Sequence, residues 1–309
     1  MSLACCATPA IGQPQDFDKV QIETIPLRDG IYMLLGEGGN IGVSAGEDGV
    51  FLIDDQFAPL TEKILSAVGE ISPEPVRFLI NTHWHFDHTG GNENLGEAGV
   101  LIFAHDQVRE LMEEDQISKL LGIEFPASPK AALPVVTFND EITFHLNGET
   151  IEAFHVESAH TGGDSVIYFK EANILHAGDV YFNGIYPFID VEHGGSINGM
   201  IAGVEELLAI VNNETSIIPG HGPLSNRSEL IVYLNMLQTV RDRVRSAIAK
   251  NRSMKEFIAS QPTADLDSSW GGGFLTPEKF LEIVYTDLAR QSPESFNFLA
   301  LHNRGMNLS

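Results

Sequence analysis

Asn81-Thr82-His83-Trp84-His85-Phe86-Asp87-His88-Thr89-Gly90-Gly91 carries the strongest chemical signal in this chain of 309 residues. The segment places three histidines and an aspartate within six positions, directly after an apolar run. Alternate residues of an extended segment share a face, so we expect His83 and His85 to point the same way. Asp87 and His88 follow where the chain turns. Imidazole and carboxylate groups are the usual ligands of divalent metals such as zinc, so the segment predicts a metal site rather than a merely polar loop.

Three further candidate ligands lie later in the chain, each just past the end of a predicted strand. His160 occupies a polar turn between two apolar runs, Asp179 ends a short apolar run, and His221 follows a Pro-Gly break. Loops positioned by a rigid sheet are where sites are usually built. We therefore expect these three side chains to complete the metal site.

Together, the HxHxDH pattern and the later His, Asp and His resemble the ligand motifs of the metallo-β-lactamase superfamily of metal-dependent hydrolases. The resemblance runs from about Gln21 to about Leu224 and continues more loosely beyond. It implies an α+β fold, an αββα sandwich of two mixed β-sheets flanked by helices, with a helical C-terminal extension. It also implies the metal ligands, which are His83, His85 and His160 for the first metal, Asp87, His88 and His221 for the second, and Asp179 bridging both.

Asp179 occupies a position that separates subgroups of this superfamily. By the resemblance, the best-known antibiotic-degrading members carry a cysteine or serine there. The resemblance therefore favours the site chemistry of lactonases and glyoxalase II-like thioesterases, while hydrolysis of β-lactams stays open. The only cysteines, Cys5 and Cys6, lie far along the chain from every ligand motif.

The expected chemistry follows from two divalent cations held close together. They share a water and lower its pKa to about 7, so that a bridging hydroxide is available as the nucleophile at neutral pH. Asp87 is the expected catalytic residue, because it can also accept a hydrogen bond from that hydroxide. The predicted reaction is hydrolysis of a small-molecule ester, lactone, thioester or β-lactam. Zinc is the expected metal, with iron and manganese as alternatives.

Two other function classes fit parts of the pattern. A mononuclear iron dioxygenase acting on a thiol or persulfide uses two histidines and a carboxylate, with open positions for substrate and oxygen. The second ligand set, Asp87, His88 and His221, argues against it. A non-catalytic, metal-stabilised binding protein would close its coordination spheres, whereas seven ligands over two metals leave room for water and substrate.

Several residues near the ligands have candidate supporting roles. Asp54 and Asp55 follow an apolar run, where they either accept a hydrogen bond from a ligand imidazole or form a plain strand-end turn. Tyr181, Tyr186 and His193 lie in and after an aromatic loop that follows the bridging aspartate, and they are the candidate substrate contacts.

Apolar runs separated by glycine-containing turns predict the strands. Expected strands are 20–27, 31–35, 41–45, 50–54, 76–80, 100–104, 166–169 and 173–177, with 135–138, 141–146 and 150–156 in a second sheet. Expected helices are 60–70, 106–114 and 196–212. The proline-containing segment 115–134 has no clear period, and we interpret it as a flap, a short helix or a plain surface connection.

The C-terminal third has a helical texture. Residues 224–259 predict one long amphipathic helix with a break near Asn251, and Thr276-Pro277 begins another helix that runs to about Ala289. The chain thus divides into a flexible N-terminus (1–19), a catalytic domain (20–224) and C-terminal helices packed on that domain (225–309). Covering a sheet is the expected role of these helices, and homodimer formation is the alternative.

Charge narrows the range of partners. The chain has 18 basic and 43 acidic residues, a formal net charge of −25. Nucleic acid is not expected as a partner, because it is bound through Lys and Arg, whereas a small-molecule substrate is expected. No run reaches the roughly 18 apolar residues that span a bilayer. The start of the chain is apolar but has no basic residue before Lys19, whereas a complete secretory signal would have one. We interpret Leu3-Ala4-Cys5-Cys6 as the remnant of a lipoprotein or export signal, which favours a periplasmic or exported location.

Overall fold

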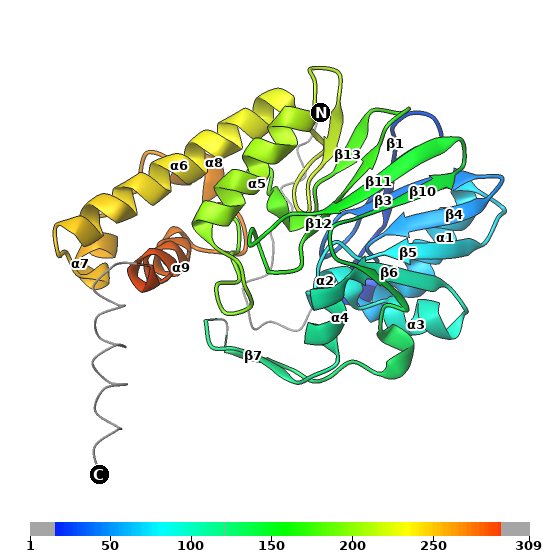
Figure 1. The fold of residues 1–309 in the computed structure, drawn as a ribbon, viewed down its shortest axis with the longest axis horizontal. Coiled ribbons are helices and arrows are strands. Elements are labelled where there is room, and N and C mark those ends of the chain that lie inside the picture. The colour runs from blue at the N-terminus through cyan, green and yellow to red at the C-terminus, as the bar shows by residue number, and fades with distance from the viewer. Residues whose placement is uncertain (1–15, 121, 292–309) are drawn as a thin grey trace, which may run out of the picture.

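The computed structural model describes residues 16–120 and 122–291. Two large β-sheets lie face to face, and helices cover their outer faces (Figure 1). The predicted αββα sandwich with a helical C-terminal extension is therefore confirmed. Among the described residues, no helix combines the length and the apolar character needed to cross a bilayer.

The first sheet has seven strands and is mixed. Its first four strands pair antiparallel, and the last three each join in parallel. In spatial order the strands are β1 (Glu23–Pro26), β2 (Ile31–Leu35), β3 (Ile41–Gly46), β4 (Gly49–Ile53), β5 (Val76–Ile80), β6 (Leu101–His105) and β9 (Val136–Phe138).

The second sheet has six strands, and only β13 and β14 pair in parallel. In spatial order the strands are β10 (Glu141–Leu146), β11 (Glu149–His155), β12 (Ser165–Phe169), β13 (Ile174–His176), β14 (Ser216–Ile218) and β15 (Ser225–Asn226).

The prediction that 135–138 belongs to the second sheet is wrong. β9 pairs in parallel with β6, with Val136 opposite Phe103, and so forms the edge of the first sheet. The strand pattern of 135–138 is too short to indicate which sheet edge it meets. Its pairing depends on where the preceding segment returns the chain, and Val135 is held beside β6 by a hydrogen bond from its N–H to the carbonyl of Ile102.

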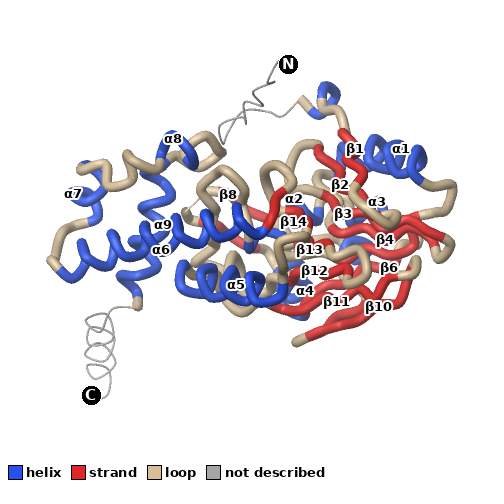
Figure 2. The backbone as a smooth tube through the Cα atoms, turned by 90° about the horizontal axis from the view of Figure 1, so that it is seen from above, coloured by secondary structure: helices blue, strands red, loops and turns tan. Residues whose placement is uncertain are grey.

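The helices fall into two groups on opposite sides of the sandwich (Figure 2). They are α1 (Thr61–Ile71), α2 (Phe86–Thr89), α3 (Asn92–Glu97), α4 (Asp106–Met112), α5 (Ile197–Ile210), α6 (Arg227–Ala249), α7 (Met254–Ala259), α8 (Asp267–Trp270) and α9 (Pro277–Arg290). Short 3-10 turns occupy Phe17–Lys19, Ala58–Leu60, Lys130–Ala132 and Gly178–Val180.

Three apolar layers hold the sandwich together. Alternate residues of facing strands, such as Phe51 and Ile151, meet between the two sheets. Ile64 and Val68 of α1 pack on the outer face of the first sheet. The outer face of the second sheet is buried under α5, α6 and α9. Burial of these faces is the main favourable term in folding.

The predicted break in the long C-terminal helix is confirmed. Asn251 has φ +52, a left-handed conformation that cannot continue a right-handed helix. Ser253 and Glu256 then form a reciprocal capping box at the start of α7. The division of the chain at 19 and 224 stays a prediction, and the export-signal interpretation falls mainly on residues 1–15, outside the described residues.

Segment 115–134 contains a small hairpin of β7 (Gln116–Ser118) and β8 (Ile123–Phe125). Its strands are three residues each, too short for a recognisable alternation. The Phe125 ring packs 5.3 Å from Trp84 and 5.4 Å from Phe86, between ring centres. The hairpin therefore lies against the histidine-rich loop.

Candidate metal centre

The histidine-rich loop begins where β5 ends and closes with the short helix α2. The side chains of Asn81 and Asn92 exchange two hydrogen bonds, of 2.9 and 3.0 Å, across the base of the loop. His83 and His85 project in the same direction, as predicted for alternate residues, with ring centres 4.8 Å apart.

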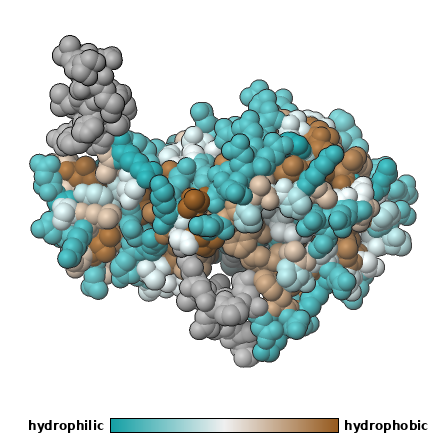
Figure 3. All heavy atoms as spheres, turned by 90° about the horizontal axis from the view of Figure 1, so that it is seen from below, coloured by the Kyte–Doolittle hydropathy of each residue, from teal (hydrophilic) through white to brown (hydrophobic). Residues whose placement is uncertain are grey.

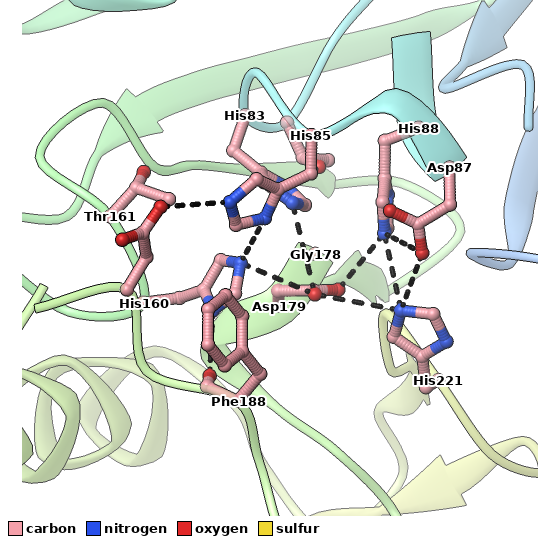
Figure 4. A network of polar contacts seen from close by, with 12 residues as sticks. His83, His85, Asp87, His88, His160, Thr161, Gly178, Asp179, Phe188 and His221 are labelled. Carbon is pink, nitrogen blue, oxygen red and sulfur yellow. Dashed lines mark hydrogen bonds and ion pairs between the residues drawn. The ribbon is translucent and has the colours of Figure 1, made fainter. Parts of the chain in front are cut away.

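Three further side chains reach this loop from the second sheet (Figure 4). His160 lies between β11 and β12, Asp179 in the 3-10 turn after β13, and His221 after β14. Figure 4 shows that all of them point toward the histidine-rich loop. The structure thus brings together all seven predicted ligand residues.

One group contains His83, His85 and His160, whose donor atoms all lie within 4.8 Å of one another. Nε2 of His160 is 2.8 Å from Nδ1 of His85. Oδ2 of Asp179 approaches the same group, at 3.4 Å from Nε2 of His160 and 3.8 Å from Nε2 of His83. Three imidazoles and one carboxylate therefore converge on one point.

A second group contains Asp87, His88 and His221, also within 4.8 Å. Nε2 of His88 is 3.3 Å from Nε2 of His221, and Oδ2 of Asp87 is 3.3 Å from the same His221 nitrogen. Oδ1 of Asp179 lies 3.2 Å from Nε2 of His88. Asp179 therefore stands between the two groups. Its Oδ1 faces His88, whereas its Oδ2 lies near the first group and also 3.5 Å from Nε2 of His221.

The donor set fits divalent cations. Nε2 of His83 is buried without a hydrogen-bond partner, a costly arrangement for a polar atom unless something else binds it. Oδ1 of Asp179 makes no well-formed hydrogen bond either, although Nε2 of His88 lies 3.2 Å away. Two pairs of imidazole nitrogens also face each other, His160 with His85 at 2.8 Å and His88 with His221 at 3.3 Å. Ring nitrogens that converge in this way are typical of metal ligands, which present their lone pairs to one ion. Nitrogen and carboxylate oxygen donors suit zinc, iron and manganese.

The outward-facing nitrogens of four histidines are each held by a hydrogen bond. His83 Nδ1 pairs with the Thr82 hydroxyl at 3.0 Å, and His160 Nδ1 donates to the Phe188 carbonyl at 2.8 Å. The corresponding partners of His88 and His85 are Asp54 and Asp190. Such bonds fix the ring tautomer and aim the other nitrogen at the centre.

Asp54 accepts hydrogen bonds from both sides of this loop. Its Oδ2 lies 2.8 Å from Nδ1 of His88 and 2.8 Å from the Thr82 hydroxyl, and its Oδ1 accepts the Thr82 N–H. Of the two roles open to Asp54, the structure thus supports orientation of a ligand imidazole. Asp55 instead accepts the N–H of Gly91.

Two supporting aspartates were missed from the sequence. Oδ2 of Asp190 is 3.0 Å from Nε2 of His85, and Asp164 accepts the backbone N–H groups of His160 and Thr161 at 2.6 and 2.8 Å. The only local signal for Asp164 is its place four residues after His160. Nothing in the sequence distinguishes Asp190 from other loop aspartates.

Close charges shift the pKa values of this cluster. Burial lowers the pKa of His160 to about 4. Burial also lowers the pKa of His221, but the carboxylates of Asp179 and Asp87 outweigh it and raise that pKa to about 9. For Asp87, burial raises the pKa, but the positive charges of His88 and His221 outweigh it and lower it to about 2. Asp87 is therefore ionised at neutral pH.

Among the described ligand residues, the two of the second group at the rim, Asp87 and His221, are the most exposed, and His85 of the first group follows at 9%. The side chain of Asp87 is 22% exposed and that of His221 16%, whereas Asp179 is 5% exposed and His160 fully buried. A small molecule from solvent therefore reaches the centre past Asp87 and His221.

The three candidate substrate contacts lie in different surroundings. Tyr181 and Tyr186 are fully buried, and their hydroxyls bond to Ser225 at 2.7 Å and Asp267 at 2.9 Å. Neither hydroxyl points to the metal cluster. Nδ1 of His193 lies 2.8 Å from Oδ2 of Asp190, so this histidine is linked to the cluster through the aspartate.

Comparison with known proteins gives a consistent match. The family model described as the metallo-β-lactamase superfamily matches residues 35–232, more than half of the chain. The probable metallo-hydrolase YqgX of Bacillus subtilis (strain 168) is 30% identical over 188 residues, which cover 56% of this chain and 83% of that protein. A hydroxyacylglutathione hydrolase of a Polaromonas species is 24% identical over 215 residues, which cover 64% and 72%.

Among solved structures, a metallo-β-lactamase from Pontibacter korlensis superposes with a TM-score of 0.59 and 21% sequence identity. The superposition covers 71% of this chain and 99% of that one. At this level of identity the likeness concerns the fold.

Proposed function

Because the chain belongs to the metallo-β-lactamase superfamily of metal-dependent hydrolases, we propose that it uses two divalent metal ions to hydrolyse ester, lactone, thioester or β-lactam bonds of small molecules. The observation that carries this proposal is the position of Asp179 between two groups of ligand side chains. A single metal would need only one group.

We assign the ligands as follows, with zinc as the expected metal. His83, His85 and His160 would hold one metal, Asp87, His88 and His221 would hold the other, and Asp179 would be a ligand shared by both. When bound, two such ions lower the pKa of a shared water to about 7 and polarise the substrate carbonyl.

Asp87 has a second role in this proposal. Its carboxylate is on the open side of the cluster and is ionised at neutral pH, because its pKa is about 2. It can therefore accept a hydrogen bond from the attacking water and hold the lone pair of that water toward the carbonyl. The hydrogen bonds of Asp54 and Asp190 keep the ligand rings in position during this step.

The residue at position 179 ranks the proposed substrate classes. By the resemblance, the best-known antibiotic-degrading members of the superfamily carry cysteine or serine at the position of Asp179. The aspartate here therefore favours esters, lactones and thioesters as substrates. β-Lactams stay in the set because the fold is shared with a metallo-β-lactamase.

The first test is the metal content per chain of protein purified without added metal, measured by inductively coupled plasma mass spectrometry. About two divalent ions per chain, mainly zinc, are expected from the two ligand groups. Turnover is then measured with p-nitrophenyl acetate, γ-butyrolactone, S-lactoylglutathione and nitrocefin. A single iron that zinc does not replace would contradict the proposal and favour thiol or persulfide oxygenation.

A matched pair of histidine variants makes this test specific. His160→Ala should lower the metal content, because His160 belongs to the first ligand group. His145→Ala changes an exposed histidine of β10 and should keep the wild-type content. Equal metal content in the two variants would contradict the ligand assignment.

A further inference from the structure

A segment outside the family match reaches the open side of the metal cluster. Phe274 lies between α8 and α9, beyond residue 232 where the match ends. Its ring centre is 6.3 Å from that of His221, at an interplanar angle of 50°. His221 and Asp87 are the two most exposed residues of the cluster.

Tyr186 fastens this segment to the loop that follows Asp179. The backbone N–H of Tyr186 donates to the carbonyl of Trp270 at 2.8 Å, and its hydroxyl donates to Asp267 at 2.9 Å. The Tyr186 ring also stacks on Phe280 of α9, with ring centres 4.7 Å apart. The position of Phe274 is therefore set by contacts on the segment before it and on the helix after it.

The segment that carries Phe274 packs closely against the loop that follows Asp179. A Cβ atom on Gly273 would lie 2.8 Å from Cβ of Ile185, a separation that real side chains do not adopt. A glycine at this position thus lets the segment lie directly on Ile185. Ile185 and Phe274 are both partly buried and pack against the same apolar cluster.

The result is an apolar wall beside His221. Phe182 stacks on the His221 ring at 5.2 Å, nearly parallel, and Phe274 and Ile185 lie further out. On the other exposed ligand, Asp87, the neighbouring Phe86 is 45% exposed. The two most exposed ligands thus have aromatic neighbours, Phe182 and Phe274 at His221, and Phe86 next to Asp87 in the chain. Figure 3 shows apolar patches interspersed with hydrophilic surface on one face of the molecule.

We propose that Phe274 is a specificity-determining residue, which selects substrates with an extended apolar group next to the scissile carbonyl, and that Tyr186 is the positioning residue that holds it there. This inference rests on the proposed function and narrows its substrate class to esters, lactones or thioesters of apolar acids. The predicted role of Tyr186 as a direct substrate contact is replaced by this indirect one.

The test uses full-length protein loaded with zinc and two carboxylates that mimic the hydrolysis product, acetate and octanoate. Isothermal titration calorimetry gives the ratio of their dissociation constants. The wild type should bind octanoate more tightly. Phe274→Ala should lower this preference roughly ten-fold, since the loss of apolar contact in a binding pocket changes discrimination by about this factor. Phe274→Leu should retain most of it.

Tyr186→Phe and Tyr285→Phe form a matched pair. Each variant loses a tyrosine hydroxyl that bonds to the C-terminal region, to Asp267 in the case of Tyr186 and to the carbonyl of Arg252 in the case of Tyr285. Only Tyr186→Phe should reduce the preference for octanoate. An unchanged preference in Phe274→Ala, or an equal effect of the two tyrosine variants, would overturn the inference. If Phe274→Ala does not fold, Phe274→Gln replaces it with the same expectation.

Failure of the proposed function gives a different result. It would appear as fewer than two metals per chain or as no hydrolysis of either p-nitrophenyl acetate or p-nitrophenyl octanoate. Failure of the inference would appear as hydrolysis and binding that do not depend on chain length. In the supporting case, Phe274→Ala lowers kcat/KM for the octanoate ester and leaves the acetate ester within about two-fold, a change smaller than one good hydrogen bond contributes.

Discussion

Oδ2 of Asp190 lies 3.0 Å from Nε2 of His85, on the side of the imidazole that faces away from the metal cluster. The same oxygen accepts a hydrogen bond from His193. Burial raises the pKa of Asp190, but the hydrogen bonds from His193 and His85 outweigh it and hold this pKa well below its usual range. Asp190 is therefore an ionised acceptor that orients a proposed metal ligand.

Asp190→Asn is expected to weaken zinc binding. The variant keeps the size of the side chain but loses the charge that fixes the His85 tautomer, and losing such a partner typically costs about 10- to 100-fold in affinity. Competition with a chromophoric chelator measures this change. Asp265→Asn, at an exposed ion pair with Arg243, is the control. Equal zinc affinity of both variants would show that Asp190 has no orienting role.

Asp87→Asn is expected to keep the fold and to lose most turnover. The amide cannot accept a proton or a hydrogen bond as strongly as the carboxylate, and general acid-base assistance typically contributes about 10²- to 10⁴-fold. Turnover is compared at equal metal content, with Asp242→Asn as an exposed control. Near-wild-type turnover by the metal-replete Asp87→Asn protein would exclude the catalytic role.

Zinc affinity is expected to rise with pH up to about 9. In the metal-free protein the carboxylates of Asp179 and Asp87 outweigh burial and raise the pKa of His221 from 6.5 to about 9, so this ring is protonated at pH 7 and must lose its proton to bind metal. Calorimetry at pH 7 in buffers of different ionisation enthalpy should detect released protons. A pH-independent affinity between 7 and 9 would contradict this expectation.

The stability that His221 contributes to the metal-free protein should fall as the pH rises, whereas zinc affinity rises. Folding raises the pKa of His221 from about 6.5 to about 9, so the folded state binds this proton more tightly than the unfolded state. The resulting contribution to the free energy of unfolding is complete below about pH 6.5 and is lost as the pH rises through about 9. The comparison of His221→Gln with wild type isolates this contribution. The stability difference between the two metal-free proteins should shrink from pH 6 to pH 9 in denaturant unfolding.

Gly220→Ala is expected to disturb the bridging ligand. A Cβ at this position would overlap Oδ1 of Asp179 and the backbone of Gly178. Overpacking of this kind costs about 1 to 3 kcal/mol, and the metal content should fall with it. Gly69→Ala, in α1 with open space around it, should be stabilising by roughly 0.5 to 1 kcal/mol. Unchanged metal content in Gly220→Ala would refute the predicted clash.

A cavity between the two sheets should lower the free energy of unfolding more than the truncation of an exposed side chain. Ile167 is fully buried in the layer between the two sheets, and its replacement by alanine is expected to lower the free energy of unfolding by about 2 to 5 kcal/mol. Val232 of α6 is 56% exposed, so Val232→Ala should stay within about 0.5 kcal/mol of wild type. Urea unfolding of both variants measures the difference.

Elements with a clear local pattern were predictable. Strands 31–35, 76–80 and 141–146 have the predicted bounds, because each alternates or runs apolar between turn residues. The start of α9 at Pro277 follows from the Thr-Pro pair, since Thr276 caps the helix and proline fits its first turn. These features depend on neighbouring residues only.

Short elements and long-range partners were not predictable in the same way. The hairpin of β7 and β8 and the sheet membership of β9 depend on which edge the chain meets. The hydroxyl of Tyr186 turns to Asp267, and that distance of 81 residues along the chain leaves no local signal. The partnership of Asp190 with His85 spans 105 residues and was missed for the same reason.

The sequence by itself determined the types and spacing of the side chains that gather in the cluster, and the strands whose ends present them. Spacing is enough for this, because alternate residues of a strand share a face and polar turns follow its end. Only the tertiary structure decided which aspartates orient the rings, which side of the cluster is open, and that Phe274 borders it. These outcomes arise from the packing of the two sheets and the C-terminal helices against one another, which no local pattern encodes.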